Sequence, residues 1–393
     1  MKIYLYGNNA NMAFNFCRFL RRMNIEAYVY VDSFPLAKSD LPEWELPQES
    51  RSEWVRYVDV SVKNLLRLRK RERRFLEELK ECDLIHSFGE ASMLTQFTNK
   101  PYLHWTYGYD LDNIPFKSGS LKHIILAAIQ RKALREAGLV IYSMPHQREL
   151  VERLRLSNSL YFPFIPIDTE RYARVRGDTK EDIRKEYNCD FLFAHLARQE
   201  WVRNEPGQQN KGNDKLFRAF ARLVKSDRVN AVMLIAEKGR DVLESKRLIA
   251  ELGIESNVEW IPALSKDKLI RFLNAVDIVF DQFNAGSAGL LVLESMSMEI
   301  PTFVYFSKEY TSFFEEPPPV INVFTEEDIY NKIIELCKNK EKGIQIGSLA
   351  REWVKKYFNW DIVTKQFIKF YGEILNGRSE WSLLKEIPRL RSE

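Results

Sequence analysis

The stretch with the most chemical content is a small-residue turn between an apolar run and a helix-like segment. Residues 276–282 read VDIVFDQ, Gly286 and Gly289 lie in the turn, and Glu294 is an acid within the apolar pattern that follows. Such a turn leaves the first backbone N–H groups of a helix open, and they favour an anion such as a diphosphate. An ionised Glu294 could accept hydrogen bonds from two vicinal hydroxyls, such as those of a ribose. The alternative is an ordinary strand-to-helix turn in which Glu294 caps the helix or is exposed.

Short apolar runs alternate with amphipathic stretches along the chain, which is typical of parallel sheets covered by helices. Strand-like runs include KIYLYG, AYVYVD, DLIHSFG, PYLHWTYG and GLVIYS in the first half, and FLFAHLAR, AVMLIAE, VEWIPAL, VDIVFDQ and PTFVYF in the second. Residues 161–182 contain two prolines and then become charged, so they predict an interdomain linker. Ligands of open α/β sheets bind at the carboxyl ends of the strands. We therefore expect two similar α/β halves with a cleft between their strand ends.

Composition limits the class of protein. The chain has 393 residues, of which 45% are hydrophobic and 29% charged, a profile of a globular protein large enough for two domains. The net charge of +4 is too mild to indicate a nucleic-acid partner. The four cysteines are scattered without a zinc-binding spacing, and no apolar run approaches the roughly 18 residues of a membrane span. These features, and an N-terminus without a signal-peptide pattern, predict a cytoplasmic protein.

The turn and helix resemble a motif of the retaining nucleotide-sugar glycosyltransferases of family 4. In that family a Glu-x7-Glu motif is followed by a small-residue helix and a strand that opens with proline, and residues 286–305 fit in order and spacing. Glu294 stands in the place of the second glutamate, and Gly286 replaces the first. The resemblance implies that the turn binds a nucleotide diphosphate and that Glu294 holds the ribose. The implied donor-binding residues in this stretch are Gly286, Ser287, Ala288, Gly289, Leu290, Leu291 and Glu294.

A pair of basic residues supports the same resemblance. Arg198 and Lys211 match an arginine after the first strand of the family's second domain and a lysine before a glycine at the next helix. Two cations at a cleft would stabilise the charge that develops on a departing diphosphate, whereas the alternative is two solvated surface cations. Residues 207–213, GQQNKGN, have P-loop glycine spacing but lack the required Lys-Ser/Thr, so they do not indicate a P-loop.

In the first half, WTYGYDL at residues 105–111 resembles the family's Thr-x-His-Gly-x-Asp segment. Tyr107 replaces the histidine, which reaches the donor sugar in the family, and Asp110 matches the aspartate. A tyrosine cannot shuttle protons near neutral pH, because its reference pKa is about 10. His86 matches a frequent first histidine of another family strand, and the nearby His104 is an alternative catalytic or structural histidine. We therefore expect Tyr107, Asp110 and His86 to be the catalytic residues.

Three further features complete the family pattern. Gly7, Asn8 and Asn9 replace its glycine-rich loop on the acceptor side and lack the GxGxxG fingerprint, so no NAD cofactor is indicated. Asp110 and Asp112 spell Asp-x-Asp, which we interpret as a helix or turn cap without metal. The resemblance implies the two-domain fold called GT-B, with an acceptor domain at 1–165, a donor domain at 166–355 and terminal helices at 356–393 that cross back to the first domain.

The sequence thus predicts a metal-independent, cofactor-free hexosyltransferase that moves a sugar from a nucleotide-diphosphate donor to a hydroxyl of a glycan, lipid-linked or small-molecule acceptor. The family resemblance implies that the transfer retains the configuration of the sugar. Because Gly286 and Tyr107 replace a glutamate and a histidine, one alternative is a degenerate protein that binds a nucleotide sugar without transferring it. A second is a nucleotide-sugar epimerase on the same fold. The basic stretches at 63–80 and 117–136 predict either a solvated basic face or a peripheral membrane contact.

Overall fold

The computed structural model describes residues 1–35, 37–60, 70–175, 186–202, 210–378 and 381. The chain divides into two compact units, unit 1 comprising residues 1–166 and 360–393 and unit 2 comprising residues 167–359. Residues 63–69 of the predicted basic stretch, residues 207–209 of the P-loop-like segment and residues 176–182 of the predicted linker lie outside the described residues.

Unit 1 is built on a parallel seven-stranded sheet in the order β3-β2-β1-β4-β5-β6-β7. Its strands are β1 (Lys2–Tyr6), β2 (Glu26–Asp32), β3 (Val55–Val58), β4 (Leu84–Phe88), β5 (Tyr102–Trp105), β6 (Leu139–Tyr142) and β7 (Ser159–Tyr161). The helices with the largest roles here are α1 (Met12–Arg22), α3 (Lys70–Leu79), α4 (Ser92–Thr95), α5 (Tyr109–Asp112), α6 (Leu121–Glu136), α7 (Gln147–Leu154) and α16 (Trp360–Leu375). Central strands such as β4 and β5 are buried along their whole length because helices cover both faces of the sheet.

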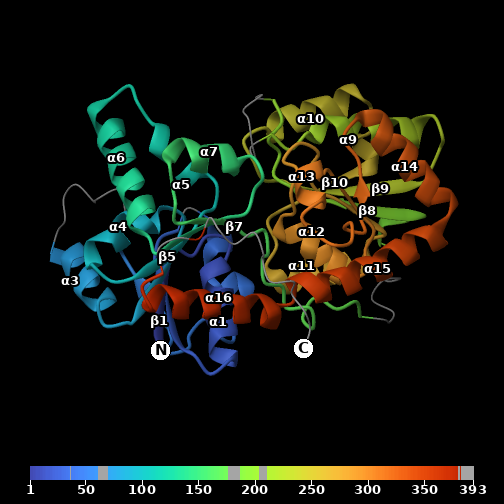
Figure 1. The fold of residues 1–393 in the computed structure, drawn as a ribbon. Coiled ribbons are helices and arrows are strands. Elements are labelled where there is room, and N and C mark those ends of the chain that lie inside the picture. Colours follow the sequence, from blue (N-terminus) through green and yellow to red (C-terminus); the bar gives the residue numbers. More distant parts are fainter. Residues whose placement is uncertain (36, 61–69, 176–185, 203–209, 379–380, 382–393) are drawn as a thin grey trace. The chain divides into compact units, whose positions relative to one another are not determined.

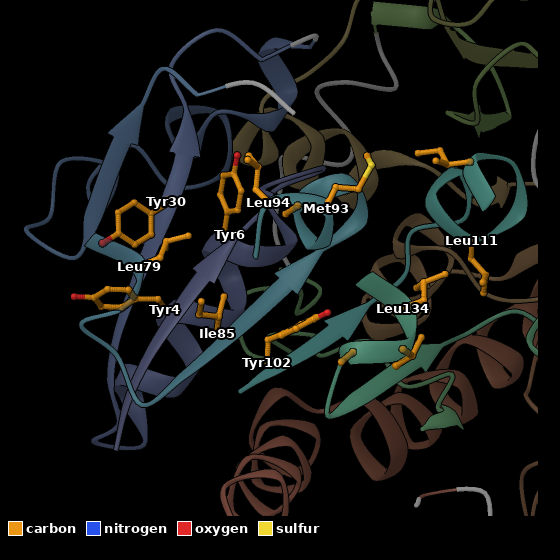
Figure 2. Close-up of a cluster of buried hydrophobic side chains, with 14 of the residues drawn as sticks. Tyr4, Tyr6, Tyr30, Leu79, Ile85, Met93, Leu94, Tyr102, Leu111 and Leu134 are labelled. Carbon is orange, nitrogen blue, oxygen red and sulfur yellow. The ribbon is translucent and has the colours of Figure 1, made fainter. Parts of the chain in front are cut away.

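The core of unit 1 is rich in tyrosine. Figure 2 shows a buried cluster in which Tyr4, Tyr6 and Tyr30 of the first strands lie with Leu79 of α3 and Leu94 of α4. The rings of Tyr4 and Tyr30 meet edge to face with their centroids 5.3 Å apart, a favourable geometry for two aromatic quadrupoles. These contacts hold the amino-terminal strands under the helices and fix the loop that follows β1.

The last long helix, α16, packs on unit 1, which confirms the predicted return of the terminal helices to the first half (Figure 1). Phe367 of α16 contacts Phe16 of α1 with a centroid distance of 4.7 Å, and Trp360 stacks on Phe19 at 5.3 Å. Beyond the helix, Trp381 is fully buried and donates its indole N–H to the carbonyl of Gly138 at 2.7 Å.

Unit 2 contains a parallel six-stranded sheet in the order β10-β9-β8-β11-β12-β13. Its strands are β8 (Phe191–His195), β9 (Ala231–Ala236), β10 (Val258–Ile261), β11 (Ile278–Phe280), β12 (Thr302–Val304) and β13 (Ile321–Asn322), and its helices are α9 (Asn213–Lys225), α10 (Val242–Glu251), α11 (Lys266–Ala275), α12 (Leu290–Ser297), α13 (Lys308–Thr311), α14 (Glu326–Lys338) and α15 (Lys340–Phe358). The strand order changes direction at β8, next to β11, so the β8 and β11 ends form the topological switch point where ligands bind in open sheets. The two parallel sheets confirm the predicted α/β fold of two Rossmann-like units.

Candidate functional site

The turn after β11 is held by a single buried side chain, that of Gln282. Its amide nitrogen donates to the carbonyl of Ser287 at 3.0 Å and to that of Tyr305 at 3.2 Å. Its amide oxygen accepts from the backbone N–H groups of Asn284 at 3.1 Å and Ala285 at 2.5 Å. Gln282 thus replaces the hydrogen bonds that a strand would supply and fixes the path of residues 283–288.

Gly286 adopts a backbone conformation that other residues rarely adopt. Its φ is +79°, and its carbonyl accepts from the N–H of Ser307 at 2.9 Å. A Cβ at this position would lie 3.2 Å from the Cβ of Ser307. Both the left-handed φ and the close neighbour favour glycine at this position.

The amino end of α12 is open to an anion. Gly289 is its N-cap, and no side chain of the described residues caps it. The N–H groups of its first turn therefore keep the partial positive charge of a helix terminus. Asp281, just beyond β11, lies beside this end, with its Oδ2 3.7 Å from the position a Cβ on Gly289 would take. Burial raises the pKa of the Asp281 carboxyl, and the charge of Lys211 opposes this increase.

Glu294 lies in the second turn of α12 and is buried. The Nζ of Lys266, the first residue of α11, forms an ion pair with its Oε1. Within the described residues, Lys266 is the one hydrogen-bond partner of this carboxylate. A carboxylate offers about four acceptor positions, and buried ones are normally filled by hydrogen bonds. The second oxygen of Glu294 therefore retains the capacity to accept hydrogen bonds from a ligand.

The two predicted cations lie near this turn. The backbone of Lys211 donates to the carbonyl of Glu200 at 2.5 Å and accepts from the N–H of Phe283 at 2.8 Å, which ties it to the start of the turn. Burial lowers the pKa of the Lys211 ammonium, Asp281 and Glu200 oppose that shift, and the charge of Arg198 adds to it. Arg198 forms an ion pair with Glu200 at 3.2 Å. Unit 2 therefore places Arg198, Lys211 and the start of α12 close together.

Behind these cations, a buried network fixes the end of β8. Asn213 donates to Nε2 of His195 at 2.8 Å and to the Oε1 of Gln199 at 3.2 Å, while Nδ1 of His195 lies 3.2 Å from the carbonyl of Phe280. Nε2 must accept, so Nδ1 carries the proton. Burial lowers the pKa of His195 to about 4. The neutral imidazole thus joins β8, β11 and the start of α9 without adding charge beside Lys211.

In unit 1, the loop that was predicted to lie on the acceptor side makes mostly internal hydrogen bonds. Gly7 has a φ of +104°, and a Cβ there would lie 2.3 Å from the carbonyl oxygen of Phe88, so the approach of β4 requires glycine. Asn8 accepts from the N–H of Phe14 at 2.9 Å and donates to the carbonyl of Asp40 at 2.6 Å. Asn9 is exposed, and its carbonyl accepts from the start of α1. Of the predicted loop residues, Asn9 is the one whose side chain faces solvent.

Tyr107 and Asp110 are joined through the backbone. The Oδ1 of Asp110 accepts from the N–H of Tyr107 at 2.8 Å, and its Oδ2 lies 2.9 Å from Nε2 of the buried His104. Nδ1 of His104 lies 3.1 Å from the hydroxyl of Ser87. Burial and the charge of Asp110 raise the pKa of Tyr107 well above its usual range. Because its pKa is raised, the buried Tyr107 hydroxyl stays neutral and can serve as a hydrogen-bonding group.

His86 lies in the interior of unit 1. Its ring is fully buried, stacks on Phe88 with a centroid distance of 4.1 Å, and is 5.3 Å from the ring of Phe367 on α16. Its Nδ1 lies 2.7 Å from the hydroxyl of Tyr371. Burial lowers the pKa of His86 well below its usual range. These contacts favour a structural role in holding α16, so the predicted catalytic role of His86 stays a prediction that the geometry does not favour.

The described residues contain no group of three or more His, Cys, Asp or Glu side chains that could hold a metal ion. In the Asp-x-Asp sequence, Asp110 binds His104 as above, whereas Asp112 accepts from Gln147 at 2.9 Å and lies 3.2 Å from Nε2 of His146. The two carboxylates therefore serve different local contacts. Among the helices of the described regions, none is long and apolar enough to cross a membrane.

Residues 207–353, which cover most of unit 2 and include the whole turn and α12, match the family model described as Glycosyl transferases group 1. This segment of unit 2 therefore matches the group 1 glycosyltransferases. The predicted family is thereby confirmed by the segment that carries Lys211, Gly286 and Glu294, while no curated protein matches the chain in sequence.

Solved structures of similar fold cover almost the whole chain. Anabaena HepE in complex with UDP-glucose has a TM-score of 0.70 and 17% identity, over 95% of this chain and 100% of that chain. Sucrose-phosphate synthase from Thermosynechococcus elongatus has a TM-score of 0.69 and 15% identity, over 96% and 99%. S. aureus TarM, in complex with UDP and two saccharide ligands, has a TM-score of 0.65 and 13% identity, over 96% and 100%. These similarities confirm the predicted GT-B fold.

Three charged residues of unit 2 were not predicted from the sequence. Glu200, Lys266 and Asp281 balance the charges of the predicted donor-binding residues, yet none of them is among the predicted site residues. The position of Asp281 directly after an apolar strand was the signal that could have identified it, because the carboxyl ends of parallel strands form the binding edge. Lys266 gave no such signal, because its partner is 28 residues away.

Proposed function

We propose that this group 1 glycosyltransferase transfers a hexose from a UDP-sugar to a hydroxyl acceptor with retention of configuration. The carrying observation is the buried Glu294 carboxylate, which has one oxygen held by Lys266 and lies behind an uncapped, glycine-bearing helix start. This arrangement suits a ribose on Glu294 and a diphosphate at the amino end of α12. Two structures of similar fold, Anabaena HepE and S. aureus TarM, were solved with UDP, which supports uracil as the base.

Lys211 and Arg198 are the residues proposed to receive the diphosphate. Lys211 is half-buried and joined by its backbone to the start of the turn, so its ammonium can reach an anion there without a large rearrangement. Cations placed in advance where charge develops stabilise a departing diphosphate and need no metal. In unit 1, Tyr107, Asp110 and Asn9 are proposed to serve the sugar and the acceptor, with Asp110 fixing the backbone of Tyr107.

The test is calorimetric titration with UDP, ADP, GDP and their sugar conjugates, without added metal. We expect one UDP-sugar to bind more tightly than UDP. Glu294→Ala should weaken binding by about 1 to 3 kcal/mol, the cost of lost hydrogen bonds to a charged partner. Glu294→Gln retains the shape and tests the charge, and Glu251→Ala at the exposed end of α10 is the matched control. Unchanged UDP affinity in Glu294→Ala would remove this residue from the site.

A second candidate function is binding of a nucleotide sugar without transfer. Its supporting observations are the conformation that favours glycine at position 286 and a tyrosine at position 107 that stays protonated. Incubation with the bound UDP-sugar separates the candidates: transfer to an acceptor or slow hydrolysis indicates a transferase, binding without turnover indicates the degenerate protein, and conversion to a second UDP-sugar without acceptor indicates an epimerase.

The proposal includes a peripheral contact of α6 with anionic lipid. The first turn of this helix exposes Leu121 at 74% and Ile124 at 51%, and the adjacent Lys122 is also exposed. Apolar side chains beside cations are the composition of helices that lie on anionic membranes. Co-sedimentation with vesicles containing phosphatidylglycerol should capture the protein, whereas pure phosphatidylcholine vesicles should not. Equal recovery by Leu121→Asp would exclude this surface.

A further inference from the structure

Lys266 and Glu294 form the most deeply buried ion pair beside the predicted ribose position. The side chain of Glu294 is 4% exposed and that of Lys266 is 20% exposed, and the Nζ of Lys266 contacts the Oε1 of Glu294. A carboxylate removed from water is stable in its charged form only when a counterion or several donors compensate for the lost hydration. Within the described residues, Lys266 is the compensating group of Glu294.

The chain holds Lys266 in place from two sides. Arg171 forms an ion pair at 3.2 Å with Asp267, the second residue of α11. The ring of Tyr172 lies 5.8 Å from the Nζ of Lys266, and the carbonyl of Tyr172 accepts from the hydroxyl of Ser297 at the end of α12. Residues 171–172 therefore fix the start of α11 and the end of α12 together, so that the ammonium stays beside the carboxylate.

Other charges around α12 are directed to its ends. Asp281 lies beside its amino end, and Arg351 of α15 donates to the carbonyl of Ser297 at its carboxyl end. Arg351 also approaches Glu299, at 3.9 Å. Among these charged groups, Lys266 is the cation that contacts the carboxylate of Glu294.

We propose that Lys266 is a positioning residue that holds the Glu294 carboxylate in the orientation in which it accepts the two hydroxyls of the donor ribose. This inference rests on the proposed function and extends it to a residue that lies outside the family motif. The ammonium occupies Oε1 and leaves Oε2 and the remaining lone pairs for the ribose, because a carboxylate offers about four acceptor positions. The opposite arrangement, in which Lys266 competes with the ribose for Glu294, predicts tighter UDP binding when the lysine is removed.

The experiment compares the binding of UDP and of 2′,3′-dideoxy-UDP by calorimetry. The affinity ratio of these two ligands isolates the ribose contact, because both carry the same diphosphate. The wild-type ratio should be about 10 or more, the value of one hydrogen bond to a charged group. In Lys266→Met, the carboxylate loses the ammonium that holds its Oε1, so the ratio should fall toward 1. Lys266→Arg keeps a cationic donor at this position and should restore the ratio.

Each other outcome has a distinct meaning. A wild-type ratio near 1, or an unchanged ratio in Glu294→Ala, overturns the proposed ribose site itself. If Lys266→Met keeps the wild-type ratio, the role of Lys266 alone is overturned. Tighter UDP binding by that variant would identify the lysine as a competitor of the ribose. If Lys266→Met does not fold, as judged by circular dichroism, Lys266→Gln gives the same comparison with a polar neutral side chain.

Discussion

Two substitutions of Gly286 separate the cost of the backbone conformation at this position from the effect of placing a carboxylate there. In Gly286→Ala, the new residue must adopt a φ near the observed +79°, and its Cβ must sit 3.2 Å from the Cβ of Ser307. The left-handed conformation costs an L-residue about 1 to 2 kcal/mol. We therefore expect a loss of about 1 to 2 kcal/mol in the free energy of unfolding of unit 2. Gly286→Glu should show the same backbone cost, so the difference between the two variants isolates the carboxylate.

Urea titration gives the overall stability, and hydrogen exchange of β11 and β12 reports the local change. Gly372→Ala is the control, because a Cβ there meets no atom within 4 Å. Helix propensity predicts that this control gains about 1 kcal/mol or stays unchanged. Calorimetry with UDP-sugars then asks whether Gly286→Glu alters the preferred sugar relative to Gly286→Ala. If Gly286→Ala retains wild-type stability within about 0.5 kcal/mol, which is the usual range of neutral substitutions, the explanation by backbone conformation is refuted.

Three further predictions concern the surrounding structure. Burial lowers the pKa of His195 to about 4 in the folded protein, whereas an unperturbed histidine has a pKa of about 6.5. The native state therefore binds fewer protons than the unfolded state, and stability should fall by about 3 kcal/mol as the pH drops from 6.5 to 4. Urea midpoints across this range should lose that slope in His195→Asn, and an unchanged slope would contradict the assignment. Lys211→Met should weaken the binding of UDP by about 1.5 to 3 kcal/mol and leave the binding of uridine unchanged. Equal losses of binding free energy for the two ligands in calorimetry would place the lysine away from the diphosphate. Trp381→Ala should lower the stability of unit 1 by about 3 to 5 kcal/mol in urea titration, and Trp381→Phe by less; a loss below about 1 kcal/mol would show that Trp381 does not anchor the terminal segment.

The sequence predicts the strand–turn–helix at the site well because its signals are local. The apolar run VDIVFDQ contains β11, and the apolar pattern after Gly289 contains α12. Strands that are buried on both faces appear in the sequence as continuous apolar runs. The number of strands and their order along the chain can therefore be predicted before any contact is known. The observed β11 is shorter than the run, and the side chain of Gln282 directly after it holds the turn.

The charge balance of the site could not be predicted, because it depends on residues distant in sequence. Lys266 and Glu294 are separated by 28 residues, and His86 and Tyr371 by 285. Neither the hydrophobic periodicity of the sequence nor the spacing within a motif indicates a contact between residues so far apart in sequence. The same limit explains why His86 matched a family histidine in sequence, although the structure surrounds it with aromatic rings under α16.

The internal charges of unit 2 suggest how affinity is divided between the parts of a nucleotide. Arg198 already pairs with Glu200, and the charge of Asp281 already acts on Lys211, so a diphosphate exchanges one set of anionic contacts for another. The net gain from the diphosphate is then smaller than the number of cations implies, since each ammonium or guanidinium loses an internal partner. Glu294 differs because one of its oxygens has no internal partner to lose within the described residues. Under the proposed function, we therefore expect the contact between the ribose and Glu294 to contribute a large share of the selectivity for a nucleotide over a free diphosphate.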